Sequence, residues 1–93
     1  MRTIDRSSTF KRDYKREAKG RHHATLDDDL KAVLVALATD QPLNVRYRDH
    51  DLSGDWAGYR ECHIKPDLLL IYRTSDSDTL RLARLGSHSE LFG

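Results

Sequence analysis

The sequence predicts an α+β fold, a small antiparallel β-sheet with two N-terminal helices packed on one face. Apolar residues recur at helical spacing in the first half of the chain and form strand-like runs, separated by short turns, in the second half. Because short turns join strands that run in opposite directions, the sheet is expected to be antiparallel. A chain of 93 residues, 38% of them hydrophobic, has room for a single domain over residues 1–93 with one modest core.

Two helices are expected in the N-terminal half, after a short strand over residues 1–5. The first spans residues 9–19, where every fourth residue is apolar, and Gly20 ends it. The second begins at Thr25, because three aspartates in its first turn complement the positive end of the helix dipole, and it ends before Pro42. Its expected buried face consists of Leu26, Leu30, Val33, Leu34 and Leu37.

Four strands are expected in the second half of the chain. The first is short and covers residues 47–49. The longer ones are expected at residues 58–64, 68–74 and 79–87, with turns at residues 66–67 and 75–78. The run from Leu68 to Tyr72 has no polar face, which is typical of a strand buried on both sides. We therefore expect it to be the central strand.

Basic residues concentrate at the N-terminal end of the chain. Residues 1–25 hold eight Lys or Arg and three acids, whereas residues 26–55 hold three and seven, although the net charge is only +1. This asymmetry suggests a surface that faces a polyanion, and the alternative is an ordinary solvated helix face. The basic side chains of the first helix are Lys11, Arg12, Lys15, Arg16 and Lys19.

Composition also indicates where the protein works. No apolar run approaches the roughly 20 residues of a membrane-spanning helix, and the first residues lack the apolar core of a signal peptide. A single cysteine, Cys62, rules out an intrachain disulfide framework and fits a reducing compartment. We expect a cytoplasmic protein without a membrane partner.

Strand periodicity brings titratable side chains together. Alternation places Tyr59, Glu61 and His63 on one face of their strand. Arg84 and His88 share one side of the last strand if the extended conformation continues that far. A concave sheet face would then assemble His50, Glu61, His63, Asp67, Arg84 and His88.

This set of side chains suits metal-independent RNA cleavage. One imidazole takes the proton of the 2′-hydroxyl group, another protonates the 5′-oxygen that leaves, and arginine stabilises the phosphate. Carboxylates hold the imidazoles in place. A zinc site built from two histidines and an aspartate is the alternative, but neither an HExxH nor a CxxC motif is present. We expect no metal and no other cofactor.

Neighbouring residues have simpler interpretations. His22 and His23 are expected to be solvated in the connection between the helices. Cys62 lies on the opposite strand face and is expected to fill the core. Trp56 and Tyr59 belong either to the core or to the edge of the site.

Two segments carry a resemblance to a known family. The stretch YRDHDLSGDWAGYRECHIKPDLLLIYR, at residues 47–73, and the end of the chain, RLGSHSELFG, resemble the YafQ-type toxins of the RelE/ParE superfamily. The resemblance implies an α+β, ribosome-dependent mRNA interferase, the toxin of a type II toxin–antitoxin pair. Such toxins cut mRNA in the ribosomal A site and are neutralised by a cognate antitoxin. The alternative is a non-catalytic member of the superfamily that binds an antitoxin or another macromolecule.

The resemblance also implies catalytic roles for single residues. The family's functional histidines fall on His50, His63 and His88, and its key aspartate falls on Asp67. His88 is expected to be a general acid or base, while the other two share the proton transfers. Glu61 stands where these toxins usually have aspartate, and its additional methylene shifts the reach of the carboxylate.

RNA contacts follow from the same resemblance. The basic first helix would face ribosomal RNA, where neutralised phosphates supply affinity without sequence readout. Phe92, the family's terminal aromatic residue, would stack on an mRNA base after residues 89–92 fold back beside His88. Arg84 is assigned to a phosphate from strand geometry alone.

Overall fold

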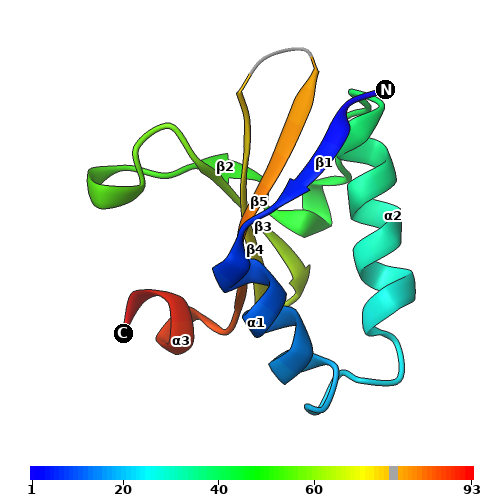
Figure 1. Cartoon of the computed structure of the whole chain (residues 1–93), viewed down its shortest axis with the longest axis vertical. Coiled ribbons are helices and arrows are strands. Elements are labelled where there is room, and N and C mark those ends of the chain that lie inside the picture. Colours follow the sequence, from blue (N-terminus) through cyan, green and yellow to red (C-terminus); the bar gives the residue numbers. More distant parts are fainter. Residues whose placement is uncertain (76–77) are drawn as a thin grey trace.

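A five-stranded sheet forms the centre of the molecule, with helices on both of its faces (Figure 1). The computed structural model describes residues 1–75 and 78–93. In spatial order the strands are β1 (Thr3–Arg6), β5 (Thr79–Gly86), β4 (Leu68–Thr74), β3 (Arg60–Lys65) and β2 (His50–Asp51). The predicted α+β fold is confirmed, and β4 is the central strand as expected.

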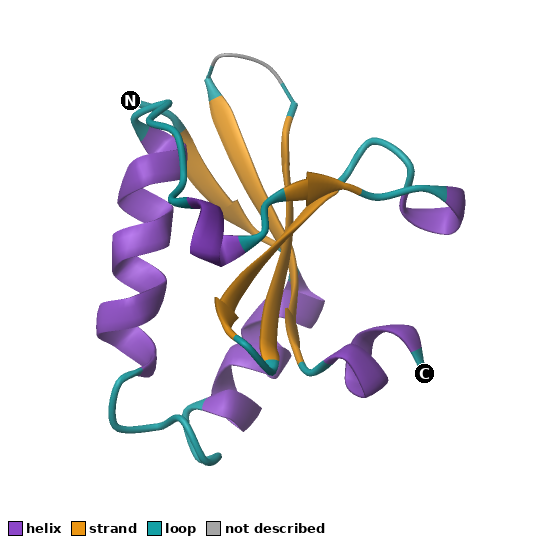
Figure 2. Cartoon of the chain, turned by 180° about the vertical axis from the view of Figure 1, so that it is seen from behind, coloured by secondary structure: helices purple, strands orange, loops and turns teal. Residues whose placement is uncertain are grey.

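Two helices follow β1, as predicted. The helix α1 spans Ser8–Glu17 and begins where the Ser7 hydroxyl accepts a hydrogen bond, at 2.9 Å, from the backbone N–H of Phe10. The helix α2 spans Leu26–Ala38 and carries three aspartates in its first turn. Figure 2 shows both helices beside the sheet, and their apolar side chains enter one core together with Leu70 and Tyr72 of β4.

The sheet is mixed, and not antiparallel throughout as expected, because its edge strand β1 runs parallel to its neighbour β5. Strands β2 to β5 pair in antiparallel fashion, as their short connections predict, but β1 runs parallel to β5. Parallel neighbours need a long connection, and the chain from α1 to β4 supplies it. Turn length constrains only strands that a short turn joins, so it carries no information on β1. The predicted turn at residues 75–78 includes residues 76 and 77, which lie outside the described part of the chain.

The short strand expected at residues 47–49 is wrong by a few residues. Val45–Tyr47 form a 3-10 helix, which the Asn44 side chain caps by accepting a hydrogen bond from the N–H of Arg46. Arg48 then adopts the left-handed conformation, with φ 50° and ψ 42°, and the chain turns into β2. A non-glycine residue costs about 1 kcal/mol in this conformation, which sequence periodicity does not reveal.

The last strand ends earlier than expected. The strand β5 stops at Gly86, and the helix α3 (His88–Phe92) follows. Ser87 and Glu90 form a capping box, in which each side chain accepts a hydrogen bond from the other residue's backbone N–H. The extended conformation expected through residues 87 and 88 is therefore wrong, whereas the expected fold-back of the chain end is confirmed as α3.

A smaller apolar cluster covers the face of the sheet opposite α1 and α2. Leu69 and Ile71 of β4 pack there with Leu91 of α3, and Trp56 and Tyr59 flank them. The two aromatic rings meet edge to face, with centroids 5.2 Å apart. These rings therefore belong to the second core. The remainder of this face, between α3 and β2, carries the candidate site.

Candidate active site

Glu61 lies between two imidazoles on the face of the sheet that α1 and α2 leave open. Its side chain is 7% exposed, and its two carboxylate oxygens lie 3.4 Å from Nε2 of His63 and 4.0 Å from Nε2 of His50. Strand alternation places His63 on the same face of β3, and register places His50 of β2 directly opposite Glu61. The predicted sharing of one strand face by Glu61 and His63 is confirmed.

The outer ring nitrogens of both histidines meet backbone carbonyl groups. Nδ1 of His50 lies 2.6 Å from the carbonyl oxygen of Arg48, and Nδ1 of His63 lies 3.4 Å from that of Pro66. A carbonyl only accepts hydrogen bonds, so Nδ1 of His50 carries a proton. The Nε2 atoms of both rings point toward Glu61, and the three side chains form one row of titratable groups.

His63 also borders an open cavity of about 420 Å³. Asp67 lines this cavity from the turn between β3 and β4, and His88 lines it from the start of α3. The register explains the convergence, because His63 of β3 pairs with Leu69 of β4, which in turn pairs with Gly86 at the end of β5. Three of the predicted site residues are thus brought to one opening.

Asp67 makes its closest contacts with the connection between α1 and α2. Its carboxylate lies 2.8 Å from Nε2 of His22 and 3.1 Å from a terminal nitrogen of Arg21. Partial burial raises the pKa of Asp67, but the His22 hydrogen bond and the Arg21 charge outweigh it and hold the pKa below its ordinary value. The expectation that His22 is merely solvated is therefore wrong. Sequence spacing contains no signal for this contact, which joins residues 45 positions apart.

The remaining histidine of the helix connection behaves as expected. His23 is exposed, and its ring nitrogen lies 3.0 Å from the carbonyl oxygen of Gly20 in the same connection. It does not line the cavity beside His88.

His88 is solvent-exposed and packs against the last aromatic ring of the chain. The ring centroids of His88 and Phe92 lie 5.0 Å apart with an interplanar angle of 42°. Both belong to α3, one helical turn apart, and Leu91 between them anchors the helix in the second core. Phe92 remains 38% exposed, so its ring is accessible to a ligand.

Arg84 is not brought to this cavity. Its Nε donates a hydrogen bond at 2.7 Å to Asp13 of α1, a residue only 3% exposed. In the sheet, Arg84 is separated from Glu61 by Ile71 of the central strand, which corresponds to about 10 Å between their backbones. The predicted assembly of Arg84 with the histidines is therefore wrong, because its long side chain turns toward the edge of β5 that α1 covers.

The basic side chains of α1 fall into two groups. Arg16 is committed to the protein, because its guanidinium contacts Asp13, Glu90 and the carbonyl oxygen of Leu85. The other four make no ion pair with any residue in the described part of the chain; they are Lys11, Arg12 and Lys15 of α1 and Lys19, which follows its end. A basic surface thus remains on this helix.

Cys62 is unsuited to nucleophilic chemistry. It is fully buried on the opposite face of β3, and burial raises the pKa of its thiol, assisted by the negative charges of Asp49 and Glu61. Its predicted role as core filling is confirmed. Within residues 1–75 and 78–93, no group of three or more His, Cys, Asp or Glu side chains is arranged to hold a metal ion.

Comparison with known proteins decides the family. The family described as "Bacterial toxin of type II toxin-antitoxin system, YafQ" matches residues 2–93 of the chain. The chain belongs to this family. The mRNA interferase toxin YafQ of Escherichia coli K12 is 40% identical to it over 94 residues, which cover 100% of this chain and 98% of that protein. The YafQ resemblance carried by residues 47–73 and by the chain end is therefore confirmed.

Solved structures agree with this YafQ family membership. A copper-bound mutant toxin from Helicobacter pylori superposes with a TM-score of 0.86 at 38% identity, covering 99% of this chain and 100% of that one. The toxin in the E. coli DinJ–YafQ toxin–antitoxin complex gives 0.82 at 40% identity, covering 99% and 98%. No helix in the described part of this YafQ-family chain is long and apolar enough to cross a membrane.

Proposed function

We propose that the protein is a ribosome-dependent mRNA endoribonuclease, the toxin of a type II pair, which cleaves mRNA in the ribosomal A site by metal-independent general acid–base catalysis. The observation that carries the proposal is the opening shared by His63, Asp67 and His88, with Glu61 and His50 behind it. Two independently placed imidazoles at one opening are what a reaction with two proton transfers requires.

The proposed reaction needs no nucleophile from the protein. The 2′-oxygen of the RNA loses its proton to a base and attacks the neighbouring phosphorus, forming a 2′,3′-cyclic phosphate. The bond to the 5′-oxygen breaks, and that oxygen receives a proton from an acid. His88 serves as one of these groups, since it is exposed at the opening. His63 or His50 serves as the other, and protons redistribute to the starting state through water.

The two carboxylates have supporting roles. Glu61 lies between His50 and His63 and stabilises whichever ring carries the additional proton. Asp67 is held by His22 and Arg21, so it positions the turn between β3 and β4 that borders the opening. In this proposal Asp67 is a positioning residue, because its contacts with the helix connection hold the β3–β4 turn at the edge of the opening.

Recognition of the ribosome and of mRNA falls to two other surfaces. The four basic side chains without an ion pair, three on α1 and Lys19 just after it, contact ribosomal RNA, where phosphates supply affinity. Phe92 stacks on a base beside the scissile phosphate, because its ring is partly exposed next to His88. The toxin would act in the cytoplasm, where its ribosomal target is found.

A cognate antitoxin is the proposed inhibitory partner. Support comes from the family match and from the E. coli relative, whose structure was solved as a DinJ–YafQ complex. An antitoxin inhibits this chemistry by covering the opening or by holding the toxin away from the ribosome.

Mapping of message ends tests the proposal. Purified protein is added to ribosomes carrying a defined mRNA and, in parallel, to the same mRNA without ribosomes, and primer extension locates new ends. We expect ends at the A-site codon only when ribosomes are present. If intact protein binds ribosomes but produces no new ends, the proposed nuclease activity is contradicted and the non-catalytic alternative remains.

A further inference from the structure

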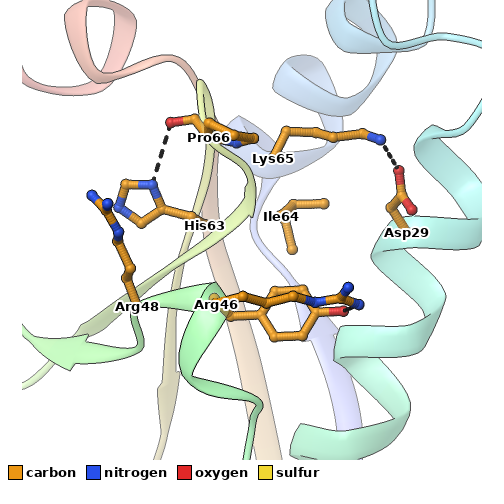
Figure 3. Close-up of a pocket in the computed structure, with 8 residues that line it drawn as sticks. Asp29, Arg46, Arg48, His63, Ile64, Lys65 and Pro66 are labelled. Carbon is orange, nitrogen blue, oxygen red and sulfur yellow. Dashed lines mark hydrogen bonds and ion pairs between the residues drawn. The ribbon is translucent and has the colours of Figure 1, made fainter.

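A second cavity, of about 400 Å³, adjoins the proposed catalytic opening (Figure 3). His63 and Pro66 line both cavities, so the two cavities meet at these residues. The second cavity is otherwise distinguished by its charged residues, Arg46, Arg48 and Lys65 together with Asp29. We call it the arginine pocket.

The charges in the arginine pocket do not cancel. Nζ of Lys65 lies 2.7 Å from a carboxylate oxygen of Asp29, and this contact lowers the pKa of Asp29, so the two side chains neutralise each other. The charge of Arg46 also acts on Asp29 and lowers its pKa, whereas Arg48 makes no ion pair with any described residue. Arg46 lies 4.8 Å from the ring centroid of Tyr47 and donates a hydrogen bond at 2.9 Å to its hydroxyl group. The Tyr47 ring thus holds the Arg46 guanidinium without satisfying its charge.

Arg48 is placed at the pocket by an uncommon backbone conformation. It is the only left-handed arginine among the described residues, and its carbonyl group accepts the Nδ1–H of His50. Its exposed side chain makes no ion pair with a described residue and lies at the same pocket wall as the His63 ring in Figure 3. The conformation that orients His50 therefore also presents an unpaired guanidinium beside His63.

We propose that the arginine pocket binds an RNA phosphodiester, that of the mRNA nucleotide adjacent to the scissile bond. Guanidinium groups match phosphate oxygens in planar, paired hydrogen bonds. Arg48 is the contact, because its guanidinium lies beside His63 and makes no ion pair with a described residue, whereas Arg46 lies toward Asp29 (Figure 3). The mRNA backbone then runs from the catalytic opening across His63 into the pocket. This inference rests on the proposed function, since it assigns the neighbouring phosphate of the same substrate.

Binding to an mRNA that cannot be cleaved tests the pocket. Ribosomes are programmed with an mRNA whose A-site nucleotides carry 2′-O-methyl groups, or with an mRNA that ends at the P-site codon. The Kd of the full chain is measured on both at several salt concentrations. We expect Arg48→Gln to weaken binding by about tenfold on the first ribosomes only. The slope of log K against log salt should fall in magnitude by about 0.7, the value for one phosphate contact with a single strand.

Two further variants make the result specific. Arg48→Gly favours the left-handed conformation and removes the guanidinium, so it should fold and show the same loss. Lys31→Gln removes an exposed charge of α2 outside the pocket and should change neither Kd nor slope. Wild-type binding by both Arg48 variants would overturn the proposal. An equal loss on both kinds of ribosome would overturn it in favour of a ribosomal RNA phosphate.

Two further measurements, of antitoxin binding and of cleavage of unmodified mRNA, separate this inference from the proposed function. Weaker binding to the antitoxin, with unchanged binding to both ribosomes, would show that the pocket takes an acidic protein segment and would overturn the proposal. Failure of the wild type to cut an unmodified mRNA on the same ribosomes would contradict the nuclease. The Kd comparison would still decide the phosphate site, because its mRNA is not cleaved.

Discussion

Glu61 is the buried carboxylate of the candidate site, and it lies between two imidazoles. Burying an ionised carboxylate is costly unless it is paired, and the only groups that face its two oxygens at ion-pair distance in the described chain are the imidazoles of His50 and His63. The arrangement places one carboxylate within reach of both imidazoles. Glutamate in this position reaches both rings from the middle of β3, which gives its additional methylene a structural use.

Substitution of Glu61 tests this assignment. Glu61→Gln keeps the shape and removes the charge, so we expect the single-turnover cleavage rate to fall by about tenfold to a hundredfold while ribosome binding stays unchanged. Glu61→Asp keeps the charge and should retain more activity than the glutamine variant. Cleavage on programmed ribosomes provides the measurement. Equal rates for wild type and Glu61→Gln would remove Glu61 from the mechanism.

His88 provides the sharpest test of the proton-transfer role. Its ring is exposed and contacts only Phe92 among the described rings, so His88→Ala should fold normally and bind ribosomes. Loss of a general acid or base should lower the cleavage rate by about 10²- to 10⁴-fold. His23→Ala is the matched control, because His23 is an exposed histidine that contacts its own loop. A His88→Ala variant that cuts like the control would show that this histidine has no catalytic role.

At the scale of elements, α1 replaces a missing strand beside β5. The strand β1 pairs with β5 only as far as Leu82, and beyond it the edge of β5 would be unpaired. Asp13 accepts a hydrogen bond at 3.0 Å from the N–H of Leu85, and Arg16 donates one at 2.9 Å to the carbonyl oxygen of the same residue. Side chains of a helix thus satisfy the backbone of an edge strand.

The Asp13 carboxylate should make stability depend on acid. Burial raises its pKa, but hydrogen bonds from Arg84 and from the Leu85 N–H outweigh burial, and the pKa of Asp13 is lowered in the folded state. Its contribution is therefore complete above the unfolded pKa of about 3.9 and is lost as the pH falls through the lower folded value. Asp13→Asn should reduce the free energy of unfolding by about 2 kcal/mol at pH 7 and should flatten its decline below pH 4.

Denaturant unfolding between pH 2.5 and 7 measures the effect of Asp13. Asp55→Asn serves as the control, since Asp55 is exposed in the 3-10 helix Gly54–Trp56 and makes no ion pair with a described residue. It should change the free energy of unfolding by less than about 0.5 kcal/mol. A similar loss in both variants would contradict a special role for the buried carboxylate.

The short helix α3 depends on contacts outside itself. Five residues do not form a stable helix alone. Glu90 closes the capping box with Ser87, and its second carboxylate oxygen lies 3.0 Å from Nε of Arg16. The hydrogen bond from the Ser87 N–H lowers the pKa of Glu90, with help from Arg16. A Cβ atom at Gly86 would lie 2.7 Å from a terminal nitrogen of Arg16, so a larger residue there would have to displace this guanidinium.

Two substitutions of Glu90 separate the cap from the ion pair. Glu90→Gln retains a capping box but loses the ion pair with Arg16, whereas Glu90→Ala loses both interactions. We expect hydrogen exchange of the Leu91 and Gly93 amides, which donate to backbone carbonyl groups within this segment, to accelerate about fivefold in the alanine variant and less in the glutamine variant. Cleavage should fall in the same order, since α3 carries His88. Identical exchange in all three proteins would show that other contacts hold the helix.

At the scale of the whole molecule, the two faces of the sheet differ in how they are covered. One face is sealed by α1 and α2, and the other leaves the imidazoles open between α3 and β2. The helix α1, which carries these basic side chains, packs beside β5 on the sealed side. The proposed ribosome contact and the proposed catalytic opening thus come from different elements held by one sheet.

The metal content of the purified protein tests the proposed metal-independent chemistry. Toxin purified from cells and treated with a chelator is analysed for metal before it is added to ribosomes, because ribosomes themselves need magnesium. We expect far less than one equivalent of zinc or copper and a cleavage rate unchanged by the chelator treatment. A stoichiometric metal whose removal abolishes cleavage and whose return restores it would refute the metal-free mechanism. The copper-bound H. pylori relative makes this measurement informative.

Prediction from the sequence succeeded where a pattern is local. Helical spacing located α1 and α2, the apolar run located β4, and alternation placed Glu61 and His63 on one face. It failed where neighbours distant in sequence decide the outcome. The contact of His22 with Asp67 and the capture of Arg84 by Asp13 depend on how loops and edges meet. Strand periodicity included His50 and His88 in the set but placed His88 on an extended strand, where the structure has α3, and the family resemblance assigned functional roles to both.

The sequence by itself determined most of the elements, the buried face of α2 and the set of side chains available for proton transfer. Apolar periodicity does this, because each element must bury one face and expose the other. Only the tertiary structure decided the parallel pairing of β1 with β5, the end of β5 at Gly86, and which charged groups are free. Those outcomes follow from backbone hydrogen bonds and ion pairs between segments far apart in the chain, so Arg16 and Arg84 are held by the protein while Arg48 remains open to a ligand.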